Sequence, residues 1–287
     1  DSRAQRGACA MVILPGSGGI SPGREEEYTK LLNRHGIAAF IVEYDEPRGM
    51  TRDFSYMLRS GSVTEFDIVT DAYSALKLLS SSPAIDPKRI GVMGFSYGAM
   101  ATRIAMDDRI RAVLAPQSPG FALYADFYGP CFQKLGTTRT NGAPLLTLRG
   151  TADSSNDLAA CAQREKELEA LGVTVERHTF EGAGHAWEIT TPQQMNDKPY
   201  IVGCELDYDA QGFAWMNGRR VSDVDADTSR LERIAARYFG NSELMDCAKY
   251  GYLVGKNEAA TQGGYDALSG FLEKWFALTP AQAARPQ

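Results

Sequence analysis

A serine flanked by glycines lies where a strand-like run passes into a helical one. The pentapeptide is Gly94-Phe95-Ser96-Tyr97-Gly98. Residues 89–93 before it form a short run typical of a buried strand, and residues 97–107 have helical spacing. Glycines let the backbone pack closely at such a strained turn, and the following helix N-terminus favours negative charge. This context predicts that Ser96 is a nucleophile, the alternative being an ordinary tight turn.

A serine hydroxyl is a weak nucleophile and needs a base within hydrogen-bond reach. The chain has three histidines, His35, His178 and His185. His35 precedes Ser96, against the serine–acid–histidine order that accompanies a turn of this kind. His178 lies inside an expected strand and is expected to be a partly buried structural residue. His185 follows that strand in a glycine-containing loop, so it is the predicted base, with a surface-loop histidine as the alternative.

The acid that orients the histidine should follow a strand and precede His185 in the chain. Asp153 is the first carboxylate after the expected strand at residues 145–148. Its role would be to fix the imidazole tautomer and to stabilise the imidazolium. The alternative is that Asp153 serves the N-terminus of the helix expected at residues 157–171.

Two backbone N–H groups are expected to bind the oxyanion of a tetrahedral intermediate. One is the Tyr97 amide, which begins the helix after Ser96. The other is assigned by position to Ser17, in the glycine-rich loop after the strand expected at residues 11–14. A phosphate-binding loop is the alternative, although no Lys-Ser or Lys-Thr follows it. The aromatic residues Phe95 and Trp187 are expected to bind substrate as pocket walls, with core packing as the alternative.

Strand-like and helical runs alternate around these residues, which predicts an α/β fold with a mostly parallel central sheet flanked by helices. The expected strands are residues 11–14, 38–44, 89–93, 112–115, 145–148 and 173–178, and the expected helices are 23–35, 66–79, 97–107, 157–171 and 265–277. Between residues 190 and 255 the periodicity dissolves. We expect a single domain over residues 1–287 with a loop-rich insertion at 190–255, before the last helix.

The composition is that of a globular chain with a sizeable core. Of 287 residues, 44% are hydrophobic and 23% charged, and the formal net charge is −6. This balance speaks against nucleic acid or an anionic membrane as a partner. No apolar run approaches the roughly 20 residues of a membrane span. No cofactor is expected, and because the cysteines show no metal-ligand spacing, no metal is expected either.

The five cysteines are expected to form two disulfides, Cys131–Cys161 and Cys204–Cys247, with Cys9 as a buried free thiol. The first pair lies where the catalytic loops should gather, and the second brackets the insertion. Such bridges imply a periplasmic or secreted protein, whereas five free thiols would imply a cytoplasmic one. The sequence starts at Asp1 without an apolar signal region, as a processed precursor or a trimmed chain would.

The order of these motifs resembles that of the dienelactone-hydrolase-like family of α/β-hydrolases. The motifs are Pro15-Gly16-Ser17-Gly18-Gly19, Pro47-Arg48-Gly49, Asp86-Pro87-Lys88-Arg89-Ile90, the Ser96 turn, Phe127-Tyr128-Gly129-Pro130-Cys131, Gly150-Thr151-Ala152-Asp153 and Gly184-His185. The resemblance covers roughly residues 10–188 and the closing helix. The chain departs from the type in having Ser96 where dienelactone hydrolases have a cysteine, Pro15 where a histidine is usual, and the insertion.

The resemblance implies an α/β-hydrolase fold and a serine esterase that cleaves small-molecule or polymeric carboxylic esters through an acyl-enzyme. Because Ser96 replaces the cysteine, dienelactone itself is not the expected substrate. Two alternatives remain open. One is a serine peptidase of the prolyl-oligopeptidase type, which uses the same triad on the same fold, and the other is a non-catalytic binding protein that kept the fold.

Overall fold

A six-stranded parallel sheet forms the centre of the computed structural model, which describes residues 7–209, 213–221, 224 and 227–278. Its strands are β1 (Ala8–Leu14), β2 (Ile37–Ile41), β3 (Ile85–Phe95), β4 (Tyr124–Phe127), β6 (Leu145–Gly150) and β7 (Val175–Phe180). Their order is β2-β1-β3-β4-β6-β7, and every neighbouring pair is parallel. The predicted mostly parallel sheet is confirmed.

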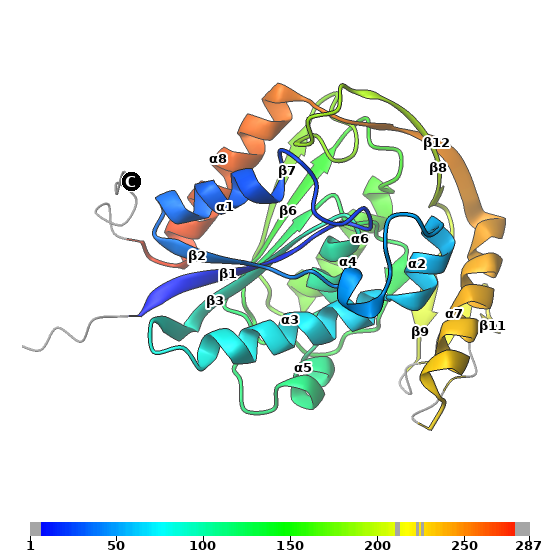
Figure 1. Cartoon of the computed structure of the whole chain (residues 1–287), viewed down its shortest axis with the longest axis horizontal. Helices are drawn as coiled ribbons and strands as arrows, with labels where there is room; N and C mark the ends of the chain where they lie inside the picture. Colours follow the sequence, from blue (N-terminus) through cyan, green and yellow to red (C-terminus); the bar gives the residue numbers. More distant parts are fainter. Residues whose placement is uncertain (1–6, 210–212, 222–223, 225–226, 279–287) are drawn as a thin grey trace, which may run out of the picture.

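Helices cover both faces of this sheet because each buried strand is apolar on both sides. In β1, Ala10, Val12 and Leu14 join one core cluster, and the alternate residues Cys9, Met11 and Ile13 join the other. The first cluster lies under α3 (Glu65–Ser80), α4 (Tyr97–Ile104), α5 (Asp108–Leu114) and α6 (Leu158–Ala170). The second lies under α1 (Glu25–Arg34) and α8 (Glu258–Trp275), which Figure 1 shows on the side of the sheet opposite α3.

The prediction of a strand at residues 112–115 is wrong. These residues end the helix α5, whose N-cap Asp107 accepts a hydrogen bond from the Arg109 amide at 2.9 Å. Val113 is 79% exposed, which a central strand would not allow. A four-residue apolar run has no period that distinguishes a strand from a helix. The strand at this place in the sheet is β4.

Regular elements also occur in the segment expected to be a loop-rich insertion. The strands are β8 (Gln194–Ile201), β9 (Leu206–Tyr208), β10 (Ala214–Met216), β11 (Arg219–Arg220) and β12 (Ala248–Val254), and the helices are α7 (Arg230–Leu244) and the 3₁₀ turn η2 (Met245–Cys247). β8 and β12 pair as an antiparallel ribbon. Its residues are mostly half-exposed, so hydrophobic and polar positions do not alternate cleanly.

The rest of the insertion builds a small sheet beside the main one. Strands β11, β10 and β9 join β5 (Gln133–Lys134) in a four-stranded sheet, which packs a core of Leu206, Ala214, Met216 and Leu244. Helix α7 packs against α2 (Tyr56–Ser62), which follows the 3₁₀ turn η1 (Glu46–Arg48). Figure 1 shows these elements and the ribbon together at one side of the central sheet.

The four cysteines of the expected pairs lie at disulfide distance. The Cα atoms are 5.0 Å apart for Cys131 and Cys161 and 5.9 Å apart for Cys204 and Cys247. Cys9 is buried in β1 as a free thiol. No helix in the described ranges has the length and apolar character to cross a membrane.

Candidate active site

Ser96 lies on a strained turn between β3 and α4. Its φ is 53° and its ψ is −111°, a conformation that residues with a Cβ rarely adopt. A Cβ on Gly94 would collide with the carbonyl oxygen of Gly98, and a Cβ on Gly98 would collide with that of Leu14. The two glycines are therefore required for the turn to close against β1, and the turn lifts the Ser96 side chain out of the sheet.

The structure brings the side chains of Ser96, His185 and Asp153 into one hydrogen-bonded chain. The His185 Nε2 atom is 2.8 Å from the Ser96 Oγ, and the His185 Nδ1 atom is 2.7 Å from the Asp153 Oδ2. Asp153 is 2% exposed and His185 8%. Burial alone would raise the pKa of the Asp153 carboxyl, but His185 and the hydrogen bonds from Ser155 hold it below its usual value. An ionised Asp153 can hold the proton of His185 on Nδ1 and leave Nε2 free to accept one.

Two residues that were not predicted from the sequence, Ser155 and Asn156, donate hydrogen bonds to the Asp153 carboxylate. The Ser155 hydroxyl donates to Asp153 Oδ1 at 2.5 Å, and the Ser155 amide donates to the same oxygen at 3.0 Å. The Asn156 side-chain amide donates to Asp153 Oδ2 at 2.8 Å and to the Tyr128 carbonyl at 3.0 Å. The sequence signal that could have identified them is their position, since small polar residues two and three positions after an aspartate often hydrogen-bond to its side chain.

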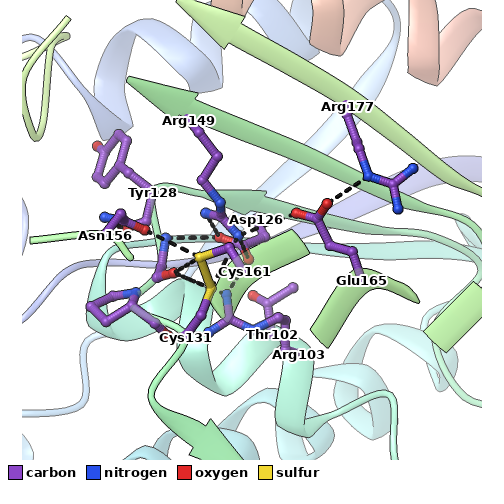
Figure 2. Close-up of polar contacts among 12 residues, drawn as sticks. Thr102, Arg103, Asp126, Tyr128, Cys131, Arg149, Asn156, Cys161, Glu165 and Arg177 are labelled. Atoms are coloured by element: carbon purple, nitrogen blue, oxygen red, sulfur yellow. Dashed lines mark hydrogen bonds and ion pairs between the residues drawn. A yellow bond between two sulfur atoms is a disulfide. The ribbon is translucent and has the colours of Figure 1, made fainter. Parts of the chain in front are cut away.

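A buried ion-pair network supports the elements that carry Ser96 and Asp153. Asp126 accepts two hydrogen bonds from Arg149, at 2.8 and 2.5 Å, and it also pairs with Arg103 of α4. Burial would raise the pKa of Asp126, but the two guanidinium groups hold it below its usual value. Figure 2 shows this cluster beside the Cys131–Cys161 disulfide. A buried carboxylate paired twice joins α4, β4 and β6.

The inserted ribbon holds the backbone of His185. The His185 amide donates to the Leu253 carbonyl at 2.7 Å, and the Gly255 amide donates to the His185 carbonyl at 3.0 Å. The imidazole packs edge-on between the rings of Tyr128, at 4.7 Å, and Tyr252, at 5.5 Å between centroids. The segment expected to be an insertion therefore holds the backbone of His185, the expected base.

A cavity of about 320 Å³ opens beside Ser96 and His185. The insertion supplies much of its wall through Lys198, Pro199, Tyr200, Ile201, Arg237, Leu244, Met245, Tyr252 and Val254. Helix α2 contributes Tyr56 and Arg59 to the wall. Arg237 is bound to the buried Glu65 at 2.7 Å. The insertion thus contributes to the shape of the space next to Ser96.

The two residues expected to bind an oxyanion, Ser17 and Tyr97, both line this cavity. Within the described ranges, neither backbone amide donates a hydrogen bond. A Cβ on Gly16 would lie 3.4 Å from the Cβ of Ser96, so the loop that carries Ser17 passes directly beside Ser96. Ser17 and Tyr97 therefore lie at the same cavity as Ser96.

Phe95 and Trp187 do not line the cavity, and their prediction as pocket walls is wrong. Both are fully buried. Phe95 packs against Phe127 at 4.9 Å, and Trp187 packs against Tyr128 at 4.6 Å. Side chains alternate between faces along a strand, so the residue before Ser96 points into the core under the sheet.

The other two histidines lie away from this site. His35 caps α1, and its Nε2 is 3.1 Å from the Ser269 hydroxyl oxygen. His178 is exposed on β7 and not partly buried as expected. The part of the chain that the structure describes contains no group of three or more His, Cys, Asp or Glu side chains arranged to hold a metal ion.

The parallel sheet and the sharp turn after its central strand β3 define an α/β-hydrolase fold. The chain belongs to the dienelactone hydrolase family, whose family model matches residues 5–215. The resemblance inferred from the motifs is confirmed. No curated protein matches the sequence significantly.

Solved structures with this fold are similar to the chain at low sequence identity. The propionate-bound esterase Est2 of the Planctomycetes species Thermogutta terrifontis is 19% identical, with a TM-score of 0.50 over 65% of this chain and 77% of that one. The same esterase phosphoramylated by tabun is 18% identical, with a TM-score of 0.51 over 65% and 76%. An acetyl ester-xyloside bifunctional hydrolase from Caldicellulosiruptor lactoaceticus is 18% identical, with a TM-score of 0.48 over 64% and 76%. The likeness to the esterase shows a shared fold.

Proposed function

We propose that the protein is a serine hydrolase that cleaves carboxylic esters through an acyl-enzyme intermediate. Ser96 is the nucleophile, His185 the base and Asp153 the residue that orients it. The observation that carries the proposal is the continuous chain of hydrogen bonds from Ser96 Oγ through His185 to Asp153, beside a cavity. Membership in a hydrolase family supports it.

The reaction follows from this arrangement in two halves. The Ser96 oxygen attacks the ester carbonyl carbon while His185 Nε2 accepts the serine proton, and Asp153 stabilises the imidazolium. The amides of Ser17 and Tyr97 donate to the oxyanion that forms. The bond to the alcohol then breaks, and the alcohol leaves with the proton from His185. Water attacks the acyl-enzyme in the same manner and releases the carboxylic acid and the free serine.

Kinetics with soluble esters test this proposal. Wild-type protein should hydrolyse p-nitrophenyl esters and not the matching p-nitroanilides, which a peptidase would cleave. Ser96→Ala and His185→Ala should each lower kcat by about 10⁴-fold, and Asp153→Asn should cost somewhat less. Ser74→Ala, at an exposed position of α3, is the control and should have wild-type kinetics. Retention of more than a tenth of the activity by Ser96→Ala would refute the proposal.

The two cysteine pairs support an oxidising compartment, and we propose that the protein is periplasmic or secreted. Cys131–Cys161 lies beside the polar network of the site, and Cys204–Cys247 closes the segment that carries α7. Both pairs join structure that surrounds the cavity. Disulfides persist in such compartments and are rare where thiols are kept reduced.

A further inference from the structure

The loop that carries Ser17 is held by its carbonyl groups. The buried Tyr44 hydroxyl lies 2.7 Å from the Gly16 carbonyl oxygen and 3.0 Å from that of Pro15. The Gly19 amide also donates to the Gly16 oxygen, at 2.8 Å. The Ser17 carbonyl accepts from Arg59 Nη1 at 2.7 Å. The carbonyl oxygens of Pro15, Gly16 and Ser17 thus all accept hydrogen bonds. The donors are the Tyr44 and Arg59 side chains and the Gly19 amide.

Fixing a carbonyl also fixes the next amide. A trans peptide unit is planar, and its C=O and N–H groups point in opposite directions. The Gly16 carbonyl and the Ser17 N–H belong to one such unit. With the Gly16 oxygen bound to Tyr44 and Gly19, the Ser17 N–H must point away from both donors. The orientation of this amide is therefore set by a side chain that does not touch the cavity.

We propose that Tyr44 is a positioning residue for the oxyanion site, acting by holding the Gly16–Ser17 peptide unit so that the Ser17 N–H faces the oxyanion. The inference rests on the proposed function. Tyr44 suits the role because it is 2% exposed, belongs to a core cluster and lies three residues after the end of β2. Burial raises the pKa of Tyr44 well above its ordinary value, so the hydroxyl stays protonated and remains a donor. Arg59 holds the following peptide unit in the same way.

The chain provides a matched control for this role. Tyr73 belongs to the same core cluster, is 1% exposed, and its hydroxyl donates to the Ala105 carbonyl at 2.7 Å, away from the cavity. Tyr44→Phe and Tyr73→Phe each delete one buried hydroxyl bonded to a backbone carbonyl. Their effects on melting temperature should be similar, so a difference in catalysis reports orientation of the loop and not stability.

The experiment compares the two variants in p-nitrophenyl ester hydrolysis and in inhibition by phenylboronic acid. The boronate forms a tetrahedral anion with the serine and therefore reports on the oxyanion site. Loss of one oxyanion donor lowers kcat by about 10² to 10³, and misorientation should cost part of this. Tyr44→Phe should lower kcat by about 10- to 100-fold, with KM changed less than about twofold. It should weaken binding of the boronate by a similar factor and leave the pH profile of kcat unchanged. Tyr73→Phe should keep kcat and boronate affinity within about twofold of wild type.

Equal kcat and equal boronate affinity in Tyr44→Phe and Tyr73→Phe would overturn the inference. If Tyr44→Phe does not fold, Arg59→Met tests the adjacent peptide unit without changing the core, and unchanged boronate affinity there would equally overturn it. Failure of the proposed function is recognised separately, because wild-type protein would then neither hydrolyse the esters nor bind the boronate.

Discussion

At the level of single residues, four hydrogen-bond donors stabilise the buried Asp153 carboxylate. Ser155 provides two of them, Asn156 one, and His185 the fourth. An ionised carboxylate is costly to bury unless its oxygens are hydrogen-bonded. Asn156 also binds the Tyr128 carbonyl, and the Tyr128 ring packs on His185. The Asn156 side-chain amide therefore supports both Asp153 and the packing of His185.

Asn156→Ala should lower kcat about tenfold with little change in KM. The change removes a donor from Asp153 Oδ2, the same oxygen that accepts from His185, so the imidazole is held less firmly. Steady-state kinetics with a soluble ester measures the effect. Asn33→Ala, at an exposed position of α1, should be silent in the same assay. Wild-type kcat in Asn156→Ala would contradict this role and show that the donors from Ser155 and His185 suffice to hold Asp153.

Glu188 is a buried carboxylate that predicts a dependence of stability on pH. It accepts hydrogen bonds from Tyr128 at 2.8 Å and Tyr28 at 3.3 Å. Burial raises the pKa of Glu188 to about 7, against the opposing effect of Arg24. Because the folded-state pKa lies above the unfolded value, the folded protein holds this proton more tightly. The contribution to stability is complete below about pH 4.5 and is lost as pH rises through about 7.

Glu188→Gln should therefore flatten the fall in stability between about pH 5 and pH 7. The wild-type contribution over this interval is about 2 kcal/mol. Urea unfolding at several pH values measures it. Glu26→Gln, which changes an exposed carboxylate, serves as the control and should keep the wild-type slope. A Glu188→Gln protein with an unaltered slope would contradict the assignment.

At the level of elements, the inserted ribbon meets the histidine loop at very close range. A Cβ on Gly184 would lie 2.5 Å from the Leu253 carbonyl oxygen, and the residue after Gly184 is held by that same carbonyl. Gly184 does not have a positive φ, so the restriction is one of space and not of backbone conformation. A glycine at this position lets β12 approach the loop that carries His185.

Gly184→Ala should lower kcat by about tenfold or more and reduce the melting temperature, because β12 must move away from His185. The comparison is Gly270→Ala in α8, where an added Cβ meets nothing within 4 Å. That variant should be more stable by up to about 1 kcal/mol, since alanine favours a helix over glycine. Thermal unfolding and ester kinetics measured together distinguish the two. Full activity in Gly184→Ala would mean that the ribbon does not position the base.

The elements that the sequence predicts well are those with a long apolar pattern. The helix expected at residues 66–79 lies within α3, and the strand expected at 145–148 lies within β6, because both bury a regular set of side chains. The segment at 112–115 is too short for a period, and β8 and β12 are half-exposed. Such elements are fixed by tertiary contacts, which a local pattern does not contain.

The same reasoning explains which site residues could be found. Ser96, Asp153 and His185 follow strands of one parallel sheet, so their meeting at its carboxyl edge could be predicted from chain order. Part of the cavity wall comes from the insertion, and residues such as Tyr252 are brought there by strand pairing far along the chain. Phe95 and Trp187 show the converse, since nearness in sequence to the site does not put a side chain in the cavity.

At the level of the whole molecule, two cysteine pairs at disulfide distance lie in the parts that surround the cavity. Cys131–Cys161 joins the segment after β4 to α6, and Cys204–Cys247 joins the segments next to β8 and β12. In the chain-entropy description, closing loops of 30 and 43 residues stabilises a protein by about 3 to 4 kcal/mol each. Because the core of the insertion is small, we expect the insertion to depend on such a constraint more than the central sheet does.

Thiol counting tests both bridges at once. Native protein that is denatured without reductant should show one reactive thiol, from Cys9, and five after reduction. The Cys204→Ser, Cys247→Ser double variant should retain the central sheet by circular dichroism and lose ester hydrolysis at a lower temperature than wild type. Five thiols without reductant would refute both disulfides and, with them, the proposed compartment.

The central claim is that Ser96 is activated for covalent attack, and labelling with a fluorophosphonate tests it most directly. After reaction and digestion, mass spectrometry should find one adduct, on the peptide that contains Ser96. Ser96→Ala should give none, and His185→Ala should label far more slowly, because a serine without its base is a weak nucleophile. Folded wild-type protein that takes no label, or takes it on a different residue, would contradict the account.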